Sequence, residues 1–229
     1  MNIAGLQKSS LLDYPSKIAA VIFTLGCNFR CPYCHNPNLI TAVSSKKLID
    51  ETAVFDFLYS RKGKLDAVVI SGGEPTLQSD LICIFEKIKN LGFLTKLDTN
   101  GTNPDILQKL INQKLVDYVA MDIKAPIEKY DKVVGRDVDL GAVKKSVEII
   151  KNSGLNYEFR TTVVRSLLSI KDFEDIAEFI CGAKNYYLQK FVSSVTLDAN
   201  FSSEKTYTDE EFEKIKNILQ KKITNVFVR

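Results

Sequence analysis

The stretch Ile18–Cys34, IAAVIFTLGCNFRCPYC, places an apolar run directly before three closely spaced cysteines. The run Ile18–Phe23 is rich in β-branched and other apolar side chains, which predicts a buried strand. Cys27, Cys31 and Cys34 follow with the spacing CxxxCxxC. Structural zinc sites and cubane iron–sulfur clusters normally take four protein ligands each. Three thiolates would leave one metal position open, so the spacing indicates a site where a substrate or cofactor can bind metal.

Two other interpretations of the cysteines are weaker. His35 follows Cys34 directly and could complete a Cys3His zinc site, but zinc ligands usually come as two well-separated pairs. A disulfide framework is disfavoured because five cysteines is an odd number and the sequence begins without a basic segment followed by an apolar one. We therefore expect reduced thiols, a cytoplasmic location and a three-cysteine iron–sulfur cluster.

The composition predicts one domain over residues 1–229. The chain is 45% hydrophobic and 26% charged, has a net charge of +3, and contains no apolar run near the ~20 residues of a membrane span. This small charge gives no indication of a nucleic-acid or membrane partner. Within the domain we expect a cluster loop at residues 24–38 and a C-terminal helix and tail at about 205–229.

Short β-branched runs alternate with helical patterns along the chain. The expected strands are Ile18–Phe23, Ala67–Ile70, Leu94–Leu97, Tyr118–Met121, Tyr157–Val164 and Tyr186–Phe191. The expected helices are Asp50–Tyr59, Ser79–Leu91, Pro104–Leu110, Leu140–Asn152, Ile170–Ile180 and a last one opening at the capping box Thr208–Glu211. Such repeats pair their strands in parallel with right-handed crossovers. Because a closed eightfold barrel needs about 250 residues, the six units predict the α/β class and a partial, open, TIM-like (β/α)6 barrel.

Polar residues follow the ends of these strands, where parallel α/β folds place their active sites. The segments are Ser71-Gly72-Gly73-Glu74-Pro75, Asp98-Thr99-Asn100-Gly101 and Asp122-Ile123-Lys124, with Arg160 and Gln189 on the last two strands. Paired glycines let a backbone approach a ligand, Glu74 can accept from an ammonium, and Lys124 and Arg160 can pair with a carboxylate. The segments therefore predict an amino-acid-like ligand beside the open metal position.

Each of these residues also has a structural interpretation. Gly72-Gly73 could form only a tight turn, and residues 98–101 could form an Asx turn between strand and helix. Lys124 could be a solvated loop lysine, and Arg160 could pair with Glu158. Their shared position after strand ends favours the functional interpretation.

Together these motifs resemble the radical S-adenosylmethionine enzymes, whose signature CxxxCxΦC has an aromatic residue at Φ, here Tyr33. The resemblance covers almost the whole chain and is closest to activating proteins of glycyl-radical enzymes, particularly the longer type for anaerobic ribonucleoside-triphosphate reductase. The shared motifs are Gly5-Leu6, Leu12-Asp13-Tyr14-Pro15, Cys31–Pro37, Gly72-Gly73-Glu74-Pro75, Leu97–Gly101, Met121–Lys124 and Arg160-Thr161-Thr162.

The resemblance implies a four-iron four-sulfur cluster on Cys27, Cys31 and Cys34, with the amine and carboxylate of S-adenosylmethionine on the fourth iron. One electron then cleaves the cofactor to methionine and a 5'-deoxyadenosyl radical, which removes hydrogen from a glycine of the partner protein. A flavodoxin or ferredoxin is the expected electron donor. The cofactors carry out the difficult chemistry, and the protein orients them.

The resemblance also implies roles for single residues. The catalytic set is Cys27, Cys31, Cys34, Lys124 and Arg160, and the cofactor-binding set is Tyr33, Gly72, Gly73, Glu74, Asp98, Thr99, Lys124 and Arg160. Glu74 and its glycines would receive the methionyl amine, and Lys124 the carboxylate. Arg160 would contact the carboxylate or sulfonium region, and Tyr33 would line the adenine. Asp98, with the carbonyls of Thr99 and Ala120, would hold a monovalent cation.

The chain departs from the family in two places. The early motif usually continues Pro-Gly, whereas Ser16 follows Pro15 here, and we expect a local change in the turn. Pyruvate formate-lyase activases carry a histidine near the last strands, where this chain has Gln189 and Lys190. Its only histidine, His35, fits a local hydrogen-bonding residue better than a ligand or base.

Cys83 and Cys181 are expected to be plain buried thiols, which leaves no cysteines for the ferredoxin insert of some other activases.

The leading hypothesis is an activase for a glycyl-radical enzyme, most specifically anaerobic ribonucleotide reductase. The alternatives are an activase for pyruvate formate-lyase, a small-molecule radical enzyme such as the deazapurine synthases, and a non-catalytic iron–sulfur or metal-binding module. The last of these would bind metal without cleaving S-adenosylmethionine.

Overall fold

The structure is a computed structural model that describes residues 1–40 and 48–229. The chain divides into two compact units. The first unit contains Met1–Asn28, Asn38–Thr99 and Asn103–Val119. The second contains Phe29–Pro37, Asn100–Thr102 and Ala120–Arg229.

Strands β1 to β4 belong to the first unit and β6 to β8 to the second, while β5 contributes residues to both. The strands are β1 (Ile3–Ser10), β2 (Ala19–Thr24), β3 (Ala67–Gly72), β4 (Leu94–Thr99), β5 (Tyr118–Asp122), β6 (Asn156–Val163), β7 (Asn185–Lys190) and β8 (Asn225–Val228). Within each unit, neighbouring strands follow chain order.

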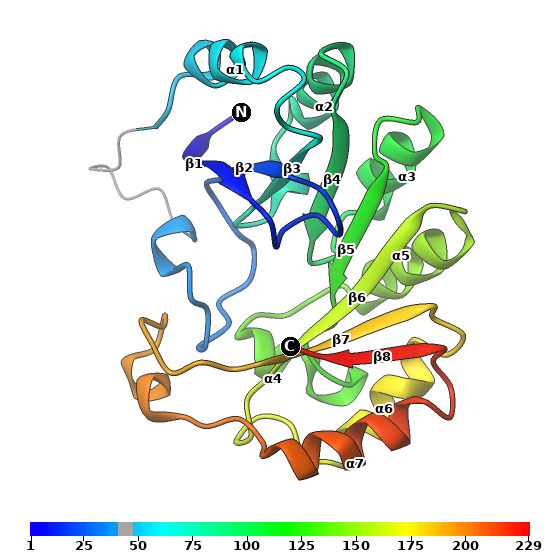
Figure 1. The fold of residues 1–229 in the computed structure, drawn as a ribbon. Helices are drawn as coiled ribbons and strands as arrows, with labels where there is room; N and C mark the ends of the chain where they lie inside the picture. The colour runs from blue at the N-terminus through cyan, green and yellow to red at the C-terminus, as the bar shows by residue number, and fades with distance from the viewer. Residues whose placement is uncertain (41–47) are drawn as a thin grey trace. The chain divides into compact units, whose positions relative to one another are not determined.

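In the first unit, β1 runs antiparallel to β2, and β2, β3 and β4 are parallel (Figure 1). Thr24 pairs with Gly72, and Ile70 pairs with Leu97. Residues 19–22 and 67–70 are fully buried, which explains their continuous apolar sequence. This register brings the carboxyl ends of β2, β3 and β4 to one edge of the sheet.

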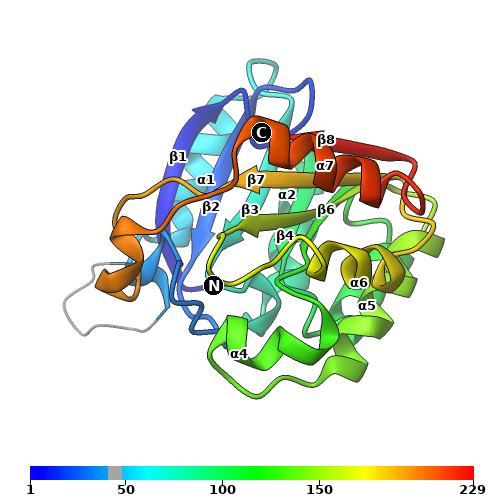
Figure 2. The ribbon, with the colours of Figure 1, turned by 90° about the horizontal axis from the view of Figure 1, so that it is seen from below.

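In the second unit, β6, β7 and β8 are parallel, and Arg160 pairs with Tyr187 in the register of β6 with β7. Helices α6 (Asp172–Phe179) and α7 (Asp209–Leu219) run side by side (Figures 1 and 2). Their buried apolar residues, among them Phe173 and Phe212, contribute to the core of this unit.

The remaining helices begin at recognisable caps or end at glycine. They are α1 (Glu51–Ser60), α2 (Leu81–Asn90), α3 (Pro104–Asn112), α4 (Tyr130–Val134) and α5 (Leu140–Asn152), with 3-10 turns at Pro37–Leu39, Pro75–Leu77, Ile127–Lys129 and Ala199–Ser203. The Asn103 side chain caps α3 with Pro104 at its first position, and Asp139 caps α5. The capping box expected at Thr208 and Glu211 is present at α7.

All six strands expected from the sequence are present, and the α/β class with parallel strands is confirmed. Two strands were missed, because β1 is polar and half-exposed and β8 has only four residues. The strand β1 is also antiparallel, which departs from the expected all-parallel pattern. The expected single domain, with its cluster loop and C-terminal tail, stays a prediction.

The prediction of buried thiols at Cys83 and Cys181 was wrong, since both residues are exposed. On α2 the buried residues are Leu81, Ile84, Phe85 and Ile88, so Cys83 lies on the opposite face of the helix. Cys181 lies just after the end of α6, beyond its buried stripe. Within residues 1–40 and 48–229, no helix is both long enough and apolar enough to cross a membrane.

Candidate active site

In the first unit, the candidate residues gather where β2, β3 and β4 end. Cys27 follows β2, Gly72 ends β3 and precedes Gly73 and Glu74, and Asp98 and Thr99 end β4. Cys27 is half-buried, and its backbone N–H donates to the Ile40 carbonyl (3.2 Å). The register of the strands thus brings together the first-unit residues that the sequence identified.

Gly72 and Gly73 lie against the backbone that leads into Cys27. Gly73 N–H donates to the Thr24 carbonyl (3.0 Å), and Glu74 N–H donates to the Gly26 carbonyl (2.8 Å). Gly72 has a φ of +118°, and a Cβ at Gly72 or Gly73 would overlap backbone atoms of Thr24 or Gly26. The glycines are therefore required by a close approach of two backbone segments.

Glu74 is buried, with a relative exposure of 1%. Its Oε1 accepts hydrogen bonds from the Thr76 N–H (3.0 Å), the Thr76 hydroxyl (2.6 Å) and the Thr99 hydroxyl (2.8 Å). These bonds cap the short 3-10 turn and tie it to the end of β4. A buried carboxylate fixed in this way is already oriented before any ligand binds.

Asp98 is held by residues of its own and the neighbouring strand. Its Oδ2 accepts from the Ser71 hydroxyl (3.1 Å), and its Oδ1 lies 3.4 Å from the Nζ of Lys96. Lys96 is itself buried, at 3% exposure. The sequence analysis assigned no role to this lysine, although its position two residues before Asp98 on a strand puts both side chains on one face.

In the second unit, Cys31 and Cys34 lie in a tight turn. The Cys34 N–H donates to the Cys31 carbonyl (3.0 Å), and the Asn36 N–H donates to the Cys34 Sγ (3.4 Å). The segment after β7 holds this turn, because Leu197 N–H donates to the Cys34 carbonyl (3.1 Å) and Asp198 N–H to the Pro32 carbonyl (2.9 Å). Hydrogen bonds therefore fix the backbone of this turn, and one of them reaches the Cys34 sulfur.

The charges around Cys31 include a candidate ligand-binding cation. Burial raises the pKa of the Cys31 thiol, and the nearby Lys124 ammonium opposes this rise. Burial also raises the pKa of Tyr33, whose ring is 4% exposed. Cys31, Tyr33 and Lys124 thus share one electrostatic environment, while their roles as cluster ligand, adenine-lining ring and carboxylate-binding lysine stay predictions.

Lys124 and Arg160 both pair with Asp122. The Lys124 Nζ lies 2.9 Å from Asp122 Oδ2, and the Arg160 Nε donates to Asp122 Oδ1 (2.8 Å). Burial alone would raise the pKa of Asp122, but the Arg160 guanidinium and the Lys124 ammonium outweigh it and hold this pKa well below its usual range. Two cations facing one carboxylate leave a positive charge that a second carboxylate, from a ligand, could balance.

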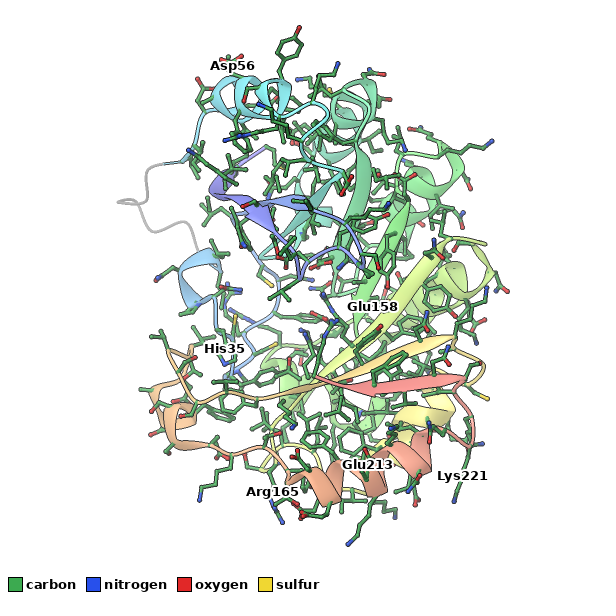
Figure 3. All side chains as sticks on the ribbon, in the orientation of Figure 1. His35, Asp56, Glu158, Arg165, Glu213 and Lys221 are labelled. Carbon is green, nitrogen blue, oxygen red and sulfur yellow. The ribbon has the colours of Figure 1, made fainter. Side chains whose placement is uncertain are left out.

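Asp122 is the residue that sequence reasoning named in a segment but gave no role. Its pairing with the two cations could have been anticipated, because Asp122 and Lys124 are two positions apart at the end of β5, and Arg160 lies on β6. Arg160 also lies 3.9 Å from the buried Glu158, labelled in Figure 3, which pairs with Arg229 at 3.0 Å. The sequence-based alternative of an Arg160–Glu158 pair is thus present, but the shorter contact is with Asp122.

Two further expectations concern local structure. The Nε2 of His35, labelled in Figure 3, lies 3.0 Å from the Val192 carbonyl, and its ring stacks on Phe191 at 5.2 Å. Asn100 Oδ1 accepts from the Thr102 N–H (3.0 Å) and hydroxyl (2.7 Å), which forms the expected Asx-type turn. Both residues therefore have local structural roles.

The donor atoms of the cysteine turn fit an iron–sulfur cluster. An N–H donated to a cysteine sulfur favours the thiolate and tunes the cluster that it binds. Among the described residues, no group of three or more His, Cys, Asp or Glu side chains is arranged to hold a metal ion. Two of the predicted thiol ligands, Cys31 and Cys34, are in the second unit, and Cys27 is in the first.

The whole chain resembles proteins of known family. The model of the radical SAM superfamily matches residues 21–180. A candidate glycyl-radical enzyme activating enzyme of Methanocaldococcus jannaschii is 37% identical, covering 99% of this chain and 95% of its own. A pyruvate formate-lyase-activating enzyme of Clostridium pasteurianum is 28% identical, covering 86% of this chain and 84% of its own.

Solved structures share the fold. A domain of a pyruvate formate-lyase-activating enzyme from Bacteroides vulgatus has a TM-score of 0.56 and 17% identity, covering 70% of this chain and 98% of its own. Streptococcus suis SuiB bound to the precursor peptide SuiA has a TM-score of 0.69 and 13% identity, covering 90% of this chain. This chain spans about half of SuiB, 47% of its length. These likenesses confirm the predicted fold class.

The family match and the M. jannaschii relative agree with the resemblance drawn from the motifs. The chain therefore belongs to the radical SAM superfamily, whose four-iron four-sulfur cluster and S-adenosylmethionine are the two cofactors expected from its sequence.

Proposed function

We propose that this protein activates a glycyl-radical enzyme, and that the partner is anaerobic ribonucleotide reductase. The observation that carries the activase proposal is the match to the M. jannaschii relative over 99% of this chain and 95% of the relative. The motifs of the longer ribonucleotide reductase activases support the choice of partner.

The bound cluster and S-adenosylmethionine would supply a 5'-deoxyadenosyl radical that removes hydrogen from a glycine of the partner. In this proposal Cys27, Cys31 and Cys34 hold the cluster. Lys124 and Arg160 bind the carboxylate side of S-adenosylmethionine, supported by the positive charge that they leave beside Asp122.

The remaining cofactor contacts are proposed from the first unit and from Tyr33. Glu74 would accept from the methionyl amine, supported by the fixed orientation of its carboxylate, with Gly72 and Gly73 shaping the backbone around it. Tyr33 would line the adenine, supported by its burial next to Cys31. Thr99 would take part by holding Glu74.

Pyruvate formate-lyase is the second candidate partner. The C. pasteurianum activating enzyme matches 86% of this chain. Against this partner, Gln189 and Lys190 stand where such activases carry a histidine, and Lys190 pairs with Asp209 at 2.5 Å. We also propose a flavodoxin or ferredoxin donor and a cytoplasmic location.

The test is an anaerobic assay with the iron–sulfur-reconstituted protein, dithionite and S-adenosylmethionine. Anaerobic ribonucleotide reductase and pyruvate formate-lyase are added in separate reactions, and 5'-deoxyadenosine and the glycyl EPR doublet are quantified. We expect the doublet on the reductase alone, in proportion to 5'-deoxyadenosine.

Each of the other possible results would change a different part of the proposal. A doublet on pyruvate formate-lyase alone would exchange the partner and keep the activase. Nucleoside formation without a doublet on either protein would favour a small-molecule radical enzyme. A fully loaded cluster with no cleavage would favour a non-catalytic module.

A further inference from the structure

The ammonium group of Lys96 lies buried next to Asp98, in the first unit. Its side chain is 3% exposed, and that of Asp98 is 11% exposed. The Lys96 Nζ lies 3.4 Å from Asp98 Oδ1 and donates a hydrogen bond to the Asp13 carbonyl. A buried ammonium is tolerated only with a partner of opposite charge, which Asp98 supplies.

The rest of the environment of Lys96 also suits a cation. Its Nζ lies over the Tyr118 ring, 5.3 Å from the ring centroid. The Tyr118 ring in turn packs against Tyr14 at 5.5 Å, next to the Asp13 carbonyl that Lys96 contacts. The ammonium thus has a carboxylate, a carbonyl oxygen and an aromatic face around it, all from the first unit.

Asp98 is also the carboxylate to which the family resemblance gives a monovalent cation. Its Oδ2 accepts a hydrogen bond from the Ser71 hydroxyl, and its Oδ1 forms an ion pair with the Lys96 ammonium at 3.4 Å, without a hydrogen bond to any described residue. A metal cation at Asp98 would bring a second positive charge next to a buried ammonium, where charges repel strongly. The residues present therefore do not fit a monovalent metal ion at this carboxylate.

We propose that the Lys96 ammonium is a built-in cation that neutralises and positions Asp98 in place of a monovalent metal ion. Binding of S-adenosylmethionine then needs neither sodium nor potassium. The proposal rests on membership of the radical SAM superfamily and not on the identity of the glycyl-radical partner.

The test measures binding of S-adenosylmethionine to the cluster-loaded protein without reductant, by equilibrium dialysis. Potassium, sodium and tetramethylammonium chloride are compared at equal ionic strength. For the wild type we expect affinities within about twofold in the three salts, because only general screening remains. An affinity that collapses in tetramethylammonium and returns with potassium or sodium would overturn the proposal without any variant.

The variant Lys96→Met removes the ammonium and leaves Asp98 as a buried carboxylate. We expect it to bind S-adenosylmethionine about tenfold more weakly in tetramethylammonium, because an uncompensated buried charge is costly. Potassium or sodium should restore most of the loss, and should raise the thermal unfolding midpoint of this variant but not of the wild type. The same affinity in all three salts for a folded Lys96→Met protein would contradict the proposal.

Two controls separate this role from a general effect on folding. The double variant Lys96→Met/Asp98→Asn removes both charges, so its unfolding midpoint should not respond to potassium or sodium. Lys89→Met removes another lysine of the first unit, which pairs with Asp117 at 2.9 Å, and should leave the salt response of the wild type unchanged. A potassium response in Lys89→Met would show a non-specific effect and would overturn the proposal.

Discussion

The two units treat their charged candidate residues differently. In the first unit, each carboxylate is surrounded by donors of that unit: Glu74 by Thr76 and Thr99, and Asp98 by Ser71 and Lys96. In the second unit, two cations share one carboxylate. The first arrangement fixes groups before a ligand arrives, while the second leaves positive charge for a ligand to balance. Substitutions in the two units should therefore change stability and cofactor affinity to different extents.

The largest effect is expected at the cysteine turn of the second unit. Cys31→Ser should lose the cluster and reduce cleavage of S-adenosylmethionine to background, because the thiolate ligand is removed. Iron content per protein measures the loss of the cluster, and 5'-deoxyadenosine per protein measures the loss of cleavage. The matched control is Cys83→Ser, an exposed cysteine on α2, which should keep full iron content. A Cys31→Ser protein with full cleavage would refute the cluster assignment.

Asp122→Asn should have the next largest effect, because it breaks the pairing with both cations. We expect a loss of about 2–3 kcal/mol in the free energy of unfolding at pH 7. This loss is at or below the usual cost of breaking a buried ion pair, because the Asp122 side chain is 26% exposed. Urea unfolding measures this loss. The exposed Asp56→Asn on α1, labelled in Figure 3, is the control and should change little.

The stabilising contribution of Asp122 should also depend on pH. Its folded-state pKa is lowered, so the contribution is complete above the unfolded value of about 3.9 and is lost as the pH falls toward the folded pKa. The gap in unfolding free energy between wild type and Asp122→Asn should be constant from pH 8 to about 5 and narrow below about 4. A gap that widens as the pH falls would show that the carboxylate does not stabilise the folded protein.

Glu74→Gln tests the pre-oriented carboxylate of the first unit. The amide oxygen can still accept from Thr76 and Thr99. The free energy of unfolding should therefore fall by only about 1–2 kcal/mol relative to the wild type. The affinity for S-adenosylmethionine should fall about tenfold, because the charge that faces the methionyl amine is lost. Unchanged affinity with lowered stability would reduce Glu74 to a structural cap.

The smallest effect is expected at Ser16, outside both groups of charged residues. Ser16 has a φ of +60°, which a glycine adopts without strain. Ser16→Gly should stabilise the protein by about 0.5 kcal/mol, the relief of strain being partly offset by the freedom of glycine in the unfolded chain. Thermal unfolding measures this gain. Affinity for S-adenosylmethionine should stay the same, and a change in affinity would link this turn to the site.

The sequence predicted the elements that bear clear periodic patterns. The expected bounds of α5 are exact, and β4 and β5 extend only one or two residues beyond the expected ends. The strand β1 was missed because its burial pattern is mostly half-exposed or exposed, so it lacks a clear alternation. The positive φ of Ser16 could be anticipated only as a departure from a Pro-Gly motif.

Within the site, residue identities were easier to predict than partners. Spacing pointed to Cys31, and the position after strand ends pointed to Glu74 and Lys124. The sequence could not show that Lys124 and Arg160 share Asp122. It also could not show that Gly73 is needed by the backbone of Gly26, since that contact joins segments distant in sequence. Pairings of this kind depend on contacts between distant segments of the chain, which local hydrophobic periodicity does not specify.

The most direct test of the activase proposal traces the hydrogen atom that moves from a glycine of the partner to 5'-deoxyadenosine. The partner glycyl-radical enzyme is prepared with deuterium on the α-carbon of its glycines and is activated anaerobically with S-adenosylmethionine and reductant. We predict that one deuterium moves from the glycine to the 5'-deoxyadenosyl radical for each glycyl radical formed. Mass spectrometry would then detect singly deuterated 5'-deoxyadenosine, and Cys31→Ser should give neither product. Formation of unlabelled 5'-deoxyadenosine, with no radical on the partner, would contradict it.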